Sequence, residues 1–170
     1  MARTEVGSRA RSLSRRATLK LSLSALGLTT FGMPLLAQPG SRANEIIVWK
    51  DPSCGCCGDW VAHLQQNGFQ VEVHNTGNAD ARQRLGVPQK LGSCHTAQIA
   101  GYAIEGHVPA REVRRLLKER PRALGLAVPG MPVGSPGMDA PEYGGRKDPF
   151  DVLLIELNGS TRNFQSYHRS

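Results

Sequence analysis

The sequence lacks an apolar stretch long enough to cross a membrane. Its longest apolar run, residues 21–36, is shorter than the ~20 residues that a membrane-spanning helix needs, and Pro34 lies near its end. The 170 residues are 39% hydrophobic and 21% charged, a composition typical of one soluble globular domain with appendages. A polytopic membrane protein, a collagen and a disordered acidic chain are excluded, and the sequence contains no internal repeat or heptad pattern.

Acidic residues are almost missing from the first quarter of the chain. The formal net charge is +7, and residues 1–43 supply seven basic residues against Glu5 alone. Residues 44–170 carry 14 basic and 13 acidic residues and are therefore close to neutral. Because a nucleic-acid-binding domain should carry a basic patch in its folded part, the sequence predicts no nucleic-acid partner.

Residues 1–43 have the order of an export signal. Arginines are frequent in residues 3–20, the apolar run follows, and small residues come next at Ala37 and residues 41–43. The alternative interpretation is an uncleaved N-terminal transmembrane anchor, for which the run is short. No cysteine lies near the expected cleavage site, so a lipoprotein anchor is not expected.

The basic part of this signal also indicates the export route. Residues 14–20, Ser-Arg-Arg-Ala-Thr-Leu-Lys, resemble the twin-arginine signal, which has a large apolar residue where this chain has Thr18. That route exports folded cargo. We expect cleavage between about Ala37 and Ala43, a mature periplasmic domain of residues 44–170, and no stable membrane insertion after cleavage.

The mature part of the chain alternates between strand and helix patterns, which predicts an α/β fold. Apolar runs and alternation predict strands at residues 45–50, 69–74, 96–100, 102–105, 151–157 and 161–167. Helical spacing predicts helices at residues 58–67, 78–85 and 109–120, with Pro109 in the first position of the third helix. Residues 124–149, rich in Pro and Gly, are expected to form a loop, and Asn158-Gly159 a hairpin turn.

The four cysteines carry the candidate chemistry. Three of them lie in the segment Cys54-Gly55-Cys56-Cys57, between the first predicted strand and the first predicted helix. Sites in α/β sheets are built at the carboxyl ends of strands, and the N–H groups at a helix N-terminus stabilise thiolates. The fourth cysteine, Cys94, precedes the third predicted strand.

Three interpretations of the cysteines compete. A structural disulfide would join Cys54 or Cys56 to Cys57 or Cys94 in an oxidising compartment. A thiol–disulfide oxidoreductase would use Cys54 and Cys57 as a Cys-x-x-Cys motif at the strand–helix junction. Metal binding would use the clustered thiolates, and it is favoured because three sulfurs within four residues exceed what a structural disulfide needs.

The position of Cys94 also favours metal binding. If residues 45–117 form a thioredoxin-like unit, the loop before Thr96 faces the N-terminus of the first helix and usually carries a cis-proline. Here Ser93-Cys94-His95 stands in that place, without a proline. A metal-binding residue then lies where an oxidoreductase would bind its peptide substrate.

Histidines and methionines extend the candidate ligand set. His95 adjoins Cys94, and His107 lies just before the third predicted helix. Met131 and Met138 lie in the Pro/Gly loop, where no helix or strand face requires them. Thiolate and thioether ligands together select Cu(I), and zinc is the less favoured ion.

Several blocks of the sequence resemble the signature of a periplasmic metal-binding family, long described as a domain of unknown function, that includes the CopG-like proteins of bacterial copper-resistance systems. The blocks lie at residues 51–60, 93–96, 106–109, 130–138 and 151–154. The resemblance implies a thioredoxin-like central sheet flanked by helices, with a Pro/Gly/Met loop and a C-terminal hairpin. It also implies copper binding by Cys54, Cys56, Cys57 and Cys94, helped by Met131, Met138 or a histidine.

The sequence therefore favours a metal-binding protein over an enzyme. The hypothesis is an exported protein that holds Cu(I) in a multi-cysteine site, with sulfurs enough for more than one ion, for copper resistance or homeostasis and with a suggested redox role. The alternative is a thiol–disulfide oxidoreductase that uses Cys54 and Cys57. The expected partners are the metal ion and either a copper exporter or a periplasmic copper carrier.

Overall fold

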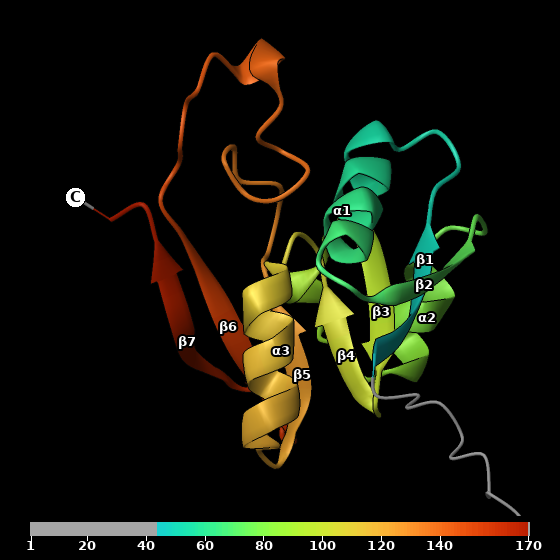
Figure 1. The fold of residues 1–170 in the computed structure, drawn as a ribbon. Coiled ribbons are helices and arrows are strands. Elements are labelled where there is room, and N and C mark those ends of the chain that lie inside the picture. Colours follow the sequence, from blue (N-terminus) through green and yellow to red (C-terminus); the bar gives the residue numbers. More distant parts are fainter. Residues whose placement is uncertain (1–43, 170) are drawn as a thin grey trace, which may run out of the picture. The chain divides into compact units, whose positions relative to one another are not determined.

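The short apolar segments form one mixed β-sheet with helices on its faces in the computed structural model, which describes residues 44–169 (Figure 1). The elements, in chain order, are β1 (Glu45–Lys50), α1 (Gly55–Gln66), β2 (Gln70–His74), α2 (Ala79–Arg84), η2 (Gln89–Leu91), β3 (His95–Ile99), β4 (Tyr102–Glu105), α3 (Ala110–Glu119), β5 (Ala123–Ala127), η3 (Pro141–Tyr143), β6 (Phe150–Glu156) and β7 (Thr161–Tyr167).

The strands lie in the order β2-β1-β3-β4-β5-β6-β7. Helix α1 joins the parallel strands β1 and β2, and α3 joins the parallel strands β4 and β5. The other neighbouring pairs are antiparallel, including the predicted C-terminal hairpin β6–β7. The carboxyl end of β1 therefore leads directly into the N-terminus of α1, where the sequence predicted the cysteine site.

Hydrophobic side chains bury both faces of the sheet. Helices α1 and α3 cover one face of the sheet (Figure 1). Buried helix residues pack there against strand residues in one core, which includes Trp60, Leu64, Val113 and Leu116 of the helices and Ile46, Val48, Ile104, Leu126 and Leu154 of the strands. The opposite face carries a smaller core of Val87, Leu91, Ala103, Ala127 and Ile155. Successive residues of β4 enter opposite cores, as the alternation of side chains along a strand requires.

The structure corrects three boundaries predicted from the sequence. Residues 124–127, expected at the start of a loop, belong to strand β5 (Ala123–Ala127), which pairs with β4 and β6. Gly125 allows the close approach to β4, because a Cβ at its position would lie 1.7 Å from Ala103 O. The loop therefore spans residues 128–149. Helix α1 begins at Gly55, about one turn earlier than predicted, and Pro109 is the N-cap of α3 rather than its first residue.

The remaining predicted helices and strands are confirmed, with ends shifted by no more than one residue. The predicted export signal lies outside the described residues. Within residues 44–169, none of the helices has the length and apolar character that crossing a membrane would require.

Candidate metal centre

A tight turn after β1 delivers three cysteines to the N-terminus of α1. The Asp51 carboxylate accepts hydrogen bonds from the Ser53 N–H (2.8 Å) and hydroxyl (2.5 Å), and the Cys54 N–H donates to Asp51 O (3.2 Å). The hydrogen bonds from Ser53 lower the pKa of Asp51, so the carboxylate is ionised at neutral pH. Cys54 is the N-cap of α1, and Cys56 and Cys57 lie in its first turn, where free N–H groups stabilise negative charge.

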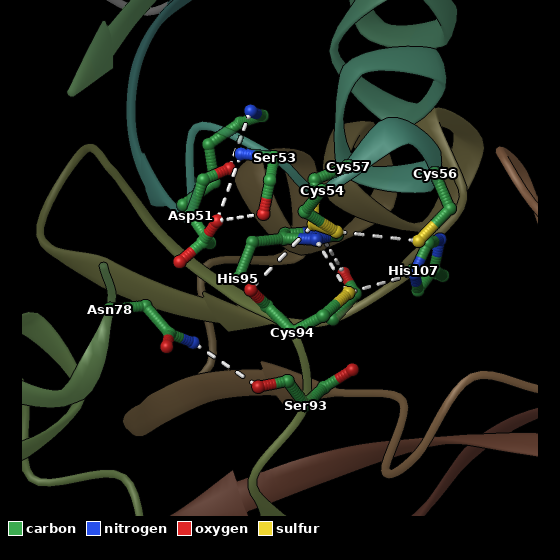
Figure 2. The surroundings of a disulfide bond; sticks show 12 residues. Asp51, Ser53, Cys54, Cys56, Cys57, Asn78, Ser93, Cys94, His95 and His107 are labelled. Carbon is green, nitrogen blue, oxygen red and sulfur yellow. Dashed lines mark hydrogen bonds between the residues drawn. A yellow bond between two sulfur atoms is a disulfide. The ribbon is translucent and has the colours of Figure 1, made fainter. Parts of the chain in front are cut away.

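Within this turn, Cys54 and Cys57 form a disulfide bond (Figure 2). Their Cα atoms are 5.5 Å apart, within the usual range for a disulfide. Cys56 carries a free thiol, and its Sγ lies 3.5 Å from Cys54 Sγ. Cys57 is buried, whereas Cys54 and Cys56 are half-buried. This disulfide is one of the pairings that the sequence left open and the one expected of a redox motif.

Cys94 reaches the same point from another part of the chain. Strands β1 and β3 are adjacent and antiparallel, so the start of β3 lies beside the end of β1. The carbonyl oxygen of Cys94 lies 3.6 Å from Cys57 Sγ, and the Cys94 side chain carries a free thiol. The ligand atoms of Cys54, Cys56, Cys57 and Cys94 all lie within 4.8 Å of one another. The structure therefore brings together the four cysteines that the sequence singled out.

Two histidines extend the cluster beyond the cysteines. Cys94 Sγ lies 3.1 Å from His107 Nε2 and 3.4 Å from His95 Nδ1 (Figure 2). The second nitrogen of each ring faces a carbonyl: His95 Nε2 donates to Gly106 O (3.0 Å), and His107 Nδ1 donates to Pro136 O (2.8 Å). Because a carbonyl can only accept, the nitrogen that faces it carries the hydrogen. The nitrogen that faces Cys94 then carries the lone pair that a metal ion requires.

Burial sets the protonation of these three groups. Burial raises the pKa of Cys94 to about 12, and the neighbouring Cys56 adds to the shift, so the Cys94 thiol is protonated at neutral pH. Burial also lowers the pKa of His107, and it lowers the pKa of His95 well below its ordinary value with a contribution from His107. Both imidazoles are therefore neutral. A metal ion bound here would replace the Cys94 proton and meet two neutral imidazoles.

The loop of residues 128–149 forms a wall of the site. Pro136 supplies the carbonyl that orients His107. The next residue, Gly137, packs so closely on the first turn of α1 that a Cβ at its position would lie 2.6 Å from Cys56 O. Pro136 and Gly137 therefore form a segment, here called the strap, that contacts both the cysteine turn and His107.

The two methionines of this loop differ in their surroundings. Met138 is buried, and its Sδ accepts a hydrogen bond from the Tyr143 hydroxyl (3.7 Å). Met131 is 51% exposed. Metal ligation by Met131 or Met138 stays a prediction.

Sequence reasoning missed the groups that hold the candidate ligands in place. Gly106 and Pro136 orient the two histidines through their backbone carbonyls, and the residue type does not indicate what a backbone carbonyl binds. Arg82 and Glu105 form a buried ion pair beside the loop that carries Cys94. A charged residue at the end of an apolar strand, directly before Gly106, was the one signal in the sequence that could have identified Glu105.

Comparison with known proteins identifies the family. The model of a family described as "Protein of unknown function, DUF411" matches residues 91–138. The solved structure of copper resistance protein CopG, form 1, is 46% identical with a TM-score of 0.67, and the alignment covers 72% of this chain and 96% of that chain. Form 2 is 44% identical with a TM-score of 0.66, covering 73% and 98% of the two chains. No curated protein matches the chain. The chain therefore belongs to the DUF411 family and to the family of the copper resistance protein CopG.

Proposed function

We propose that this protein binds Cu(I) through several thiolates and serves copper resistance, the role for which its CopG relatives are named. The observation that carries the proposal is the convergence of four sulfurs and two imidazole nitrogens at the end of β1. Thiolates are soft ligands that favour Cu(I), and imidazole suits copper or zinc. Hard cations such as Mg²⁺ and Ca²⁺ prefer oxygen ligands, which neither group of donors contains.

The donor set supports a site for more than one ion. Cys94 belongs both to the group of four cysteines and to a second group with His95 and His107. A thiolate sulfur has lone pairs enough to bridge two metal ions, so Cys94 can serve both groups at once. Copper bound here would supply one-electron redox chemistry, while the protein fixes the positions of the sulfurs and nitrogens.

The redox state of the cysteines controls how many donors are free. The Cys54–Cys57 disulfide must be reduced before all four cysteines can act as thiolates. In the disulfide form, Cys56 and Cys94 remain free, together with the two imidazoles. We therefore expect the reduced protein to bind more Cu(I) than the oxidised protein.

The proposal extends to fold family, location and partners. The order β2-β1-β3-β4, with α1 and α3 on one face, supports a thioredoxin-like unit. The order of charged, apolar and small residues in residues 1–43 supports export to the periplasm by a twin-arginine route. A copper exporter or a periplasmic copper carrier is the expected partner, because a Cu(I)-binding protein has to exchange its ion with another.

A thiol–disulfide oxidoreductase is the second candidate function. It is favoured by the disulfide between Cys54 and Cys57 at the start of α1, where a helix N-terminus stabilises the attacking thiolate. The two functions assign different roles to Cys56. A two-cysteine redox enzyme does not need that residue, whereas a multi-thiolate copper site does.

The test is an anaerobic titration of the reduced protein with Cu(I) against a coloured Cu(I) chelator, with zinc as a competitor. We expect tight Cu(I) binding, and Cys56→Ser should lower the stoichiometry or the affinity because its Sγ lies only 3.5 Å from Cys54 Sγ. Disulfide exchange with a dithiol is measured on the same variant. Unchanged Cu(I) binding by Cys56→Ser, together with rapid exchange at Cys54–Cys57, would support the oxidoreductase instead.

A further inference from the structure

A buried ion pair lies beside the loop that carries Cys94. Arg82 of α2 reaches across to Glu105 at the end of β4, and its Nε and one terminal nitrogen lie 2.9 Å and 2.8 Å from Glu105 Oε1. Glu105 is completely buried and Arg82 is 9% exposed. A buried pair is weak evidence for stability by itself, because apolar residues of similar size often stabilise a core as well. The role of this ion pair is therefore better judged from its hydrogen bonds to other groups.

The ion pair holds Ser93, the residue before Cys94, at both of its backbone polar groups. The Ser93 N–H donates to Glu105 Oε1 (2.7 Å), and Ser93 O accepts from the Arg82 guanidinium (2.5 Å). Asn78 adds a third hydrogen bond, from its side-chain amide to Ser93 O (3.2 Å; Figure 2). These partners belong to α2, its N-cap and β4, so the loop is tied to two separate elements.

The same carboxylate also holds the chain beyond the site. Glu105 Oε2 accepts a hydrogen bond from the Thr96 hydroxyl (2.6 Å). One carboxylate therefore binds Ser93 through one oxygen and Thr96 through the other. The dipeptide between them is Cys94-His95, which supplies two members of the candidate metal centre.

We propose that Arg82 and Glu105 are positioning residues of the copper site, which hold Cys94 Sγ opposite the cysteines of α1. This inference rests on the proposed function and names what sets the geometry of its site. Cys54, Cys56 and Cys57 are held together by the first turn of α1 and its N-cap. Cys94 lies one residue before β3, whose pairing with β1 brings it beside that turn, and anchoring of Ser93 and Thr96 on either side fixes the dipeptide that carries its sulfur. Directed hydrogen bonds to Ser93 and Thr96 do this, and an apolar pair in the same place would not.

The experiment compares two buried carboxylates in the reduced, metal-free protein. Glu105→Gln keeps the size of the side chain but removes the charge that Arg82 binds. Glu112→Gln is the matched control. Glu112 is also buried, and its carboxylate accepts hydrogen bonds from Arg111 and Tyr167, which lie outside the site. Brief alkylation followed by peptide mass spectrometry gives the reaction rate of each cysteine, and thermal unfolding gives the stability of each variant.

We expect Cys94 to be alkylated faster in Glu105→Gln than in the wild type or in Glu112→Gln, with the three α1 cysteines unchanged. The Cu(I) affinity of Glu105→Gln should fall by about 10- to 100-fold, the range found when groups that orient metal ligands are replaced. In a Cys94→Ser background, Glu105→Gln should cause a smaller further loss of Cu(I) affinity than in the wild type, because only its effect on His95 remains. Arg82→Lys, which keeps a cation beside Glu105, provides the same comparison if Glu105→Gln does not fold.

Equal Cys94 alkylation in Glu105→Gln and Glu112→Gln would overturn the proposal, as would an equal loss of Cu(I) affinity with and without Cys94. If the wild type binds no Cu(I), the proposed function fails, while the alkylation rates still decide whether Arg82 and Glu105 position Cys94.

Discussion

The strap around Gly137 gives the sharpest test of how the loop supports the site. The φ of Gly137 is +84°, in the left-handed region, and a Cβ on Gly137 would lie 2.6 Å from Cys56 O and 2.8 Å from Trp60 N. Both are backbone atoms of α1, which cannot yield because Trp60 and Leu64 anchor the helix in the core. In Gly137→Ala, the strap must therefore move away from the helix.

The size of the effect follows from two contributions. A left-handed conformation costs a residue other than glycine about 1–2 kcal/mol. The steric overlap with α1 adds about 1–3 kcal/mol, the usual cost of forcing an extra carbon into a packed site. Gly145→Ala, in the same loop, is the matched control, because its φ is +74° and no atom lies within 4 Å of a Cβ there. It should show the conformational cost alone.

Urea unfolding of both variants measures these costs, and chelator competition measures Cu(I) affinity. We expect Gly137→Ala to lose about 1–3 kcal/mol more stability than Gly145→Ala. It should also bind Cu(I) about 10- to 100-fold more weakly, because movement of the strap removes the Pro136 carbonyl from His107 Nδ1. Equal stability and equal Cu(I) affinity in the two variants would show that the strap neither packs on α1 nor orients His107.

Two further changes test the fold around the site. His63 Nε2 accepts the Ala110 N–H (3.1 Å) at the start of α3, and burial lowers the pKa of His63. The stabilisation by neutral His63 is therefore complete above the unfolded pKa of 6.5 and declines as the pH falls below it. Urea unfolding at about pH 7.5 and about pH 5 should show that the wild type loses more unfolding free energy between these pH values than His63→Gln does. Equal losses of unfolding free energy in the two proteins would contradict this role. Gly125→Ala should lower stability by more than about 4 kcal/mol, because its Cβ would collide with Ala103 O and separate β5 from β4. Circular dichroism would detect this loss, and a cooperative transition near that of the wild type would refute it.

The cysteine site could be predicted because its signals are local. Three cysteines adjoin one strand–helix junction, and the strand order places Cys94 opposite them. His95 and His107 were also predicted as candidates, and both rings face Cys94. Residue types, their positions and the expected strand order therefore identified the four cysteines and two histidines that the structure brings together.

Other features depended on tertiary contacts that no local pattern records. Strand β5 has the sequence Ala-Leu-Gly-Leu-Ala, without the β-branched or aromatic residues that favour strands. It is a strand because β4 and β6 pair with it on both sides. The Arg82–Glu105 pair was missed for a similar reason, since its two residues are 23 positions apart and meet only after α2 packs against the sheet.

The carbonyls of Gly106 and Pro136 have a consequence for the thermodynamics and kinetics of the proposed metal binding. Hydrogen bonds to the folded backbone orient both imidazole rings, so the rotational entropy of these rings is lost when the chain folds and not when an ion binds. A preorganised ligand set of this kind should load without a slow rearrangement. It should also discriminate between ions by the bond directions they accept, so that the selectivity of the site is a property of the folded backbone as much as of its sulfurs.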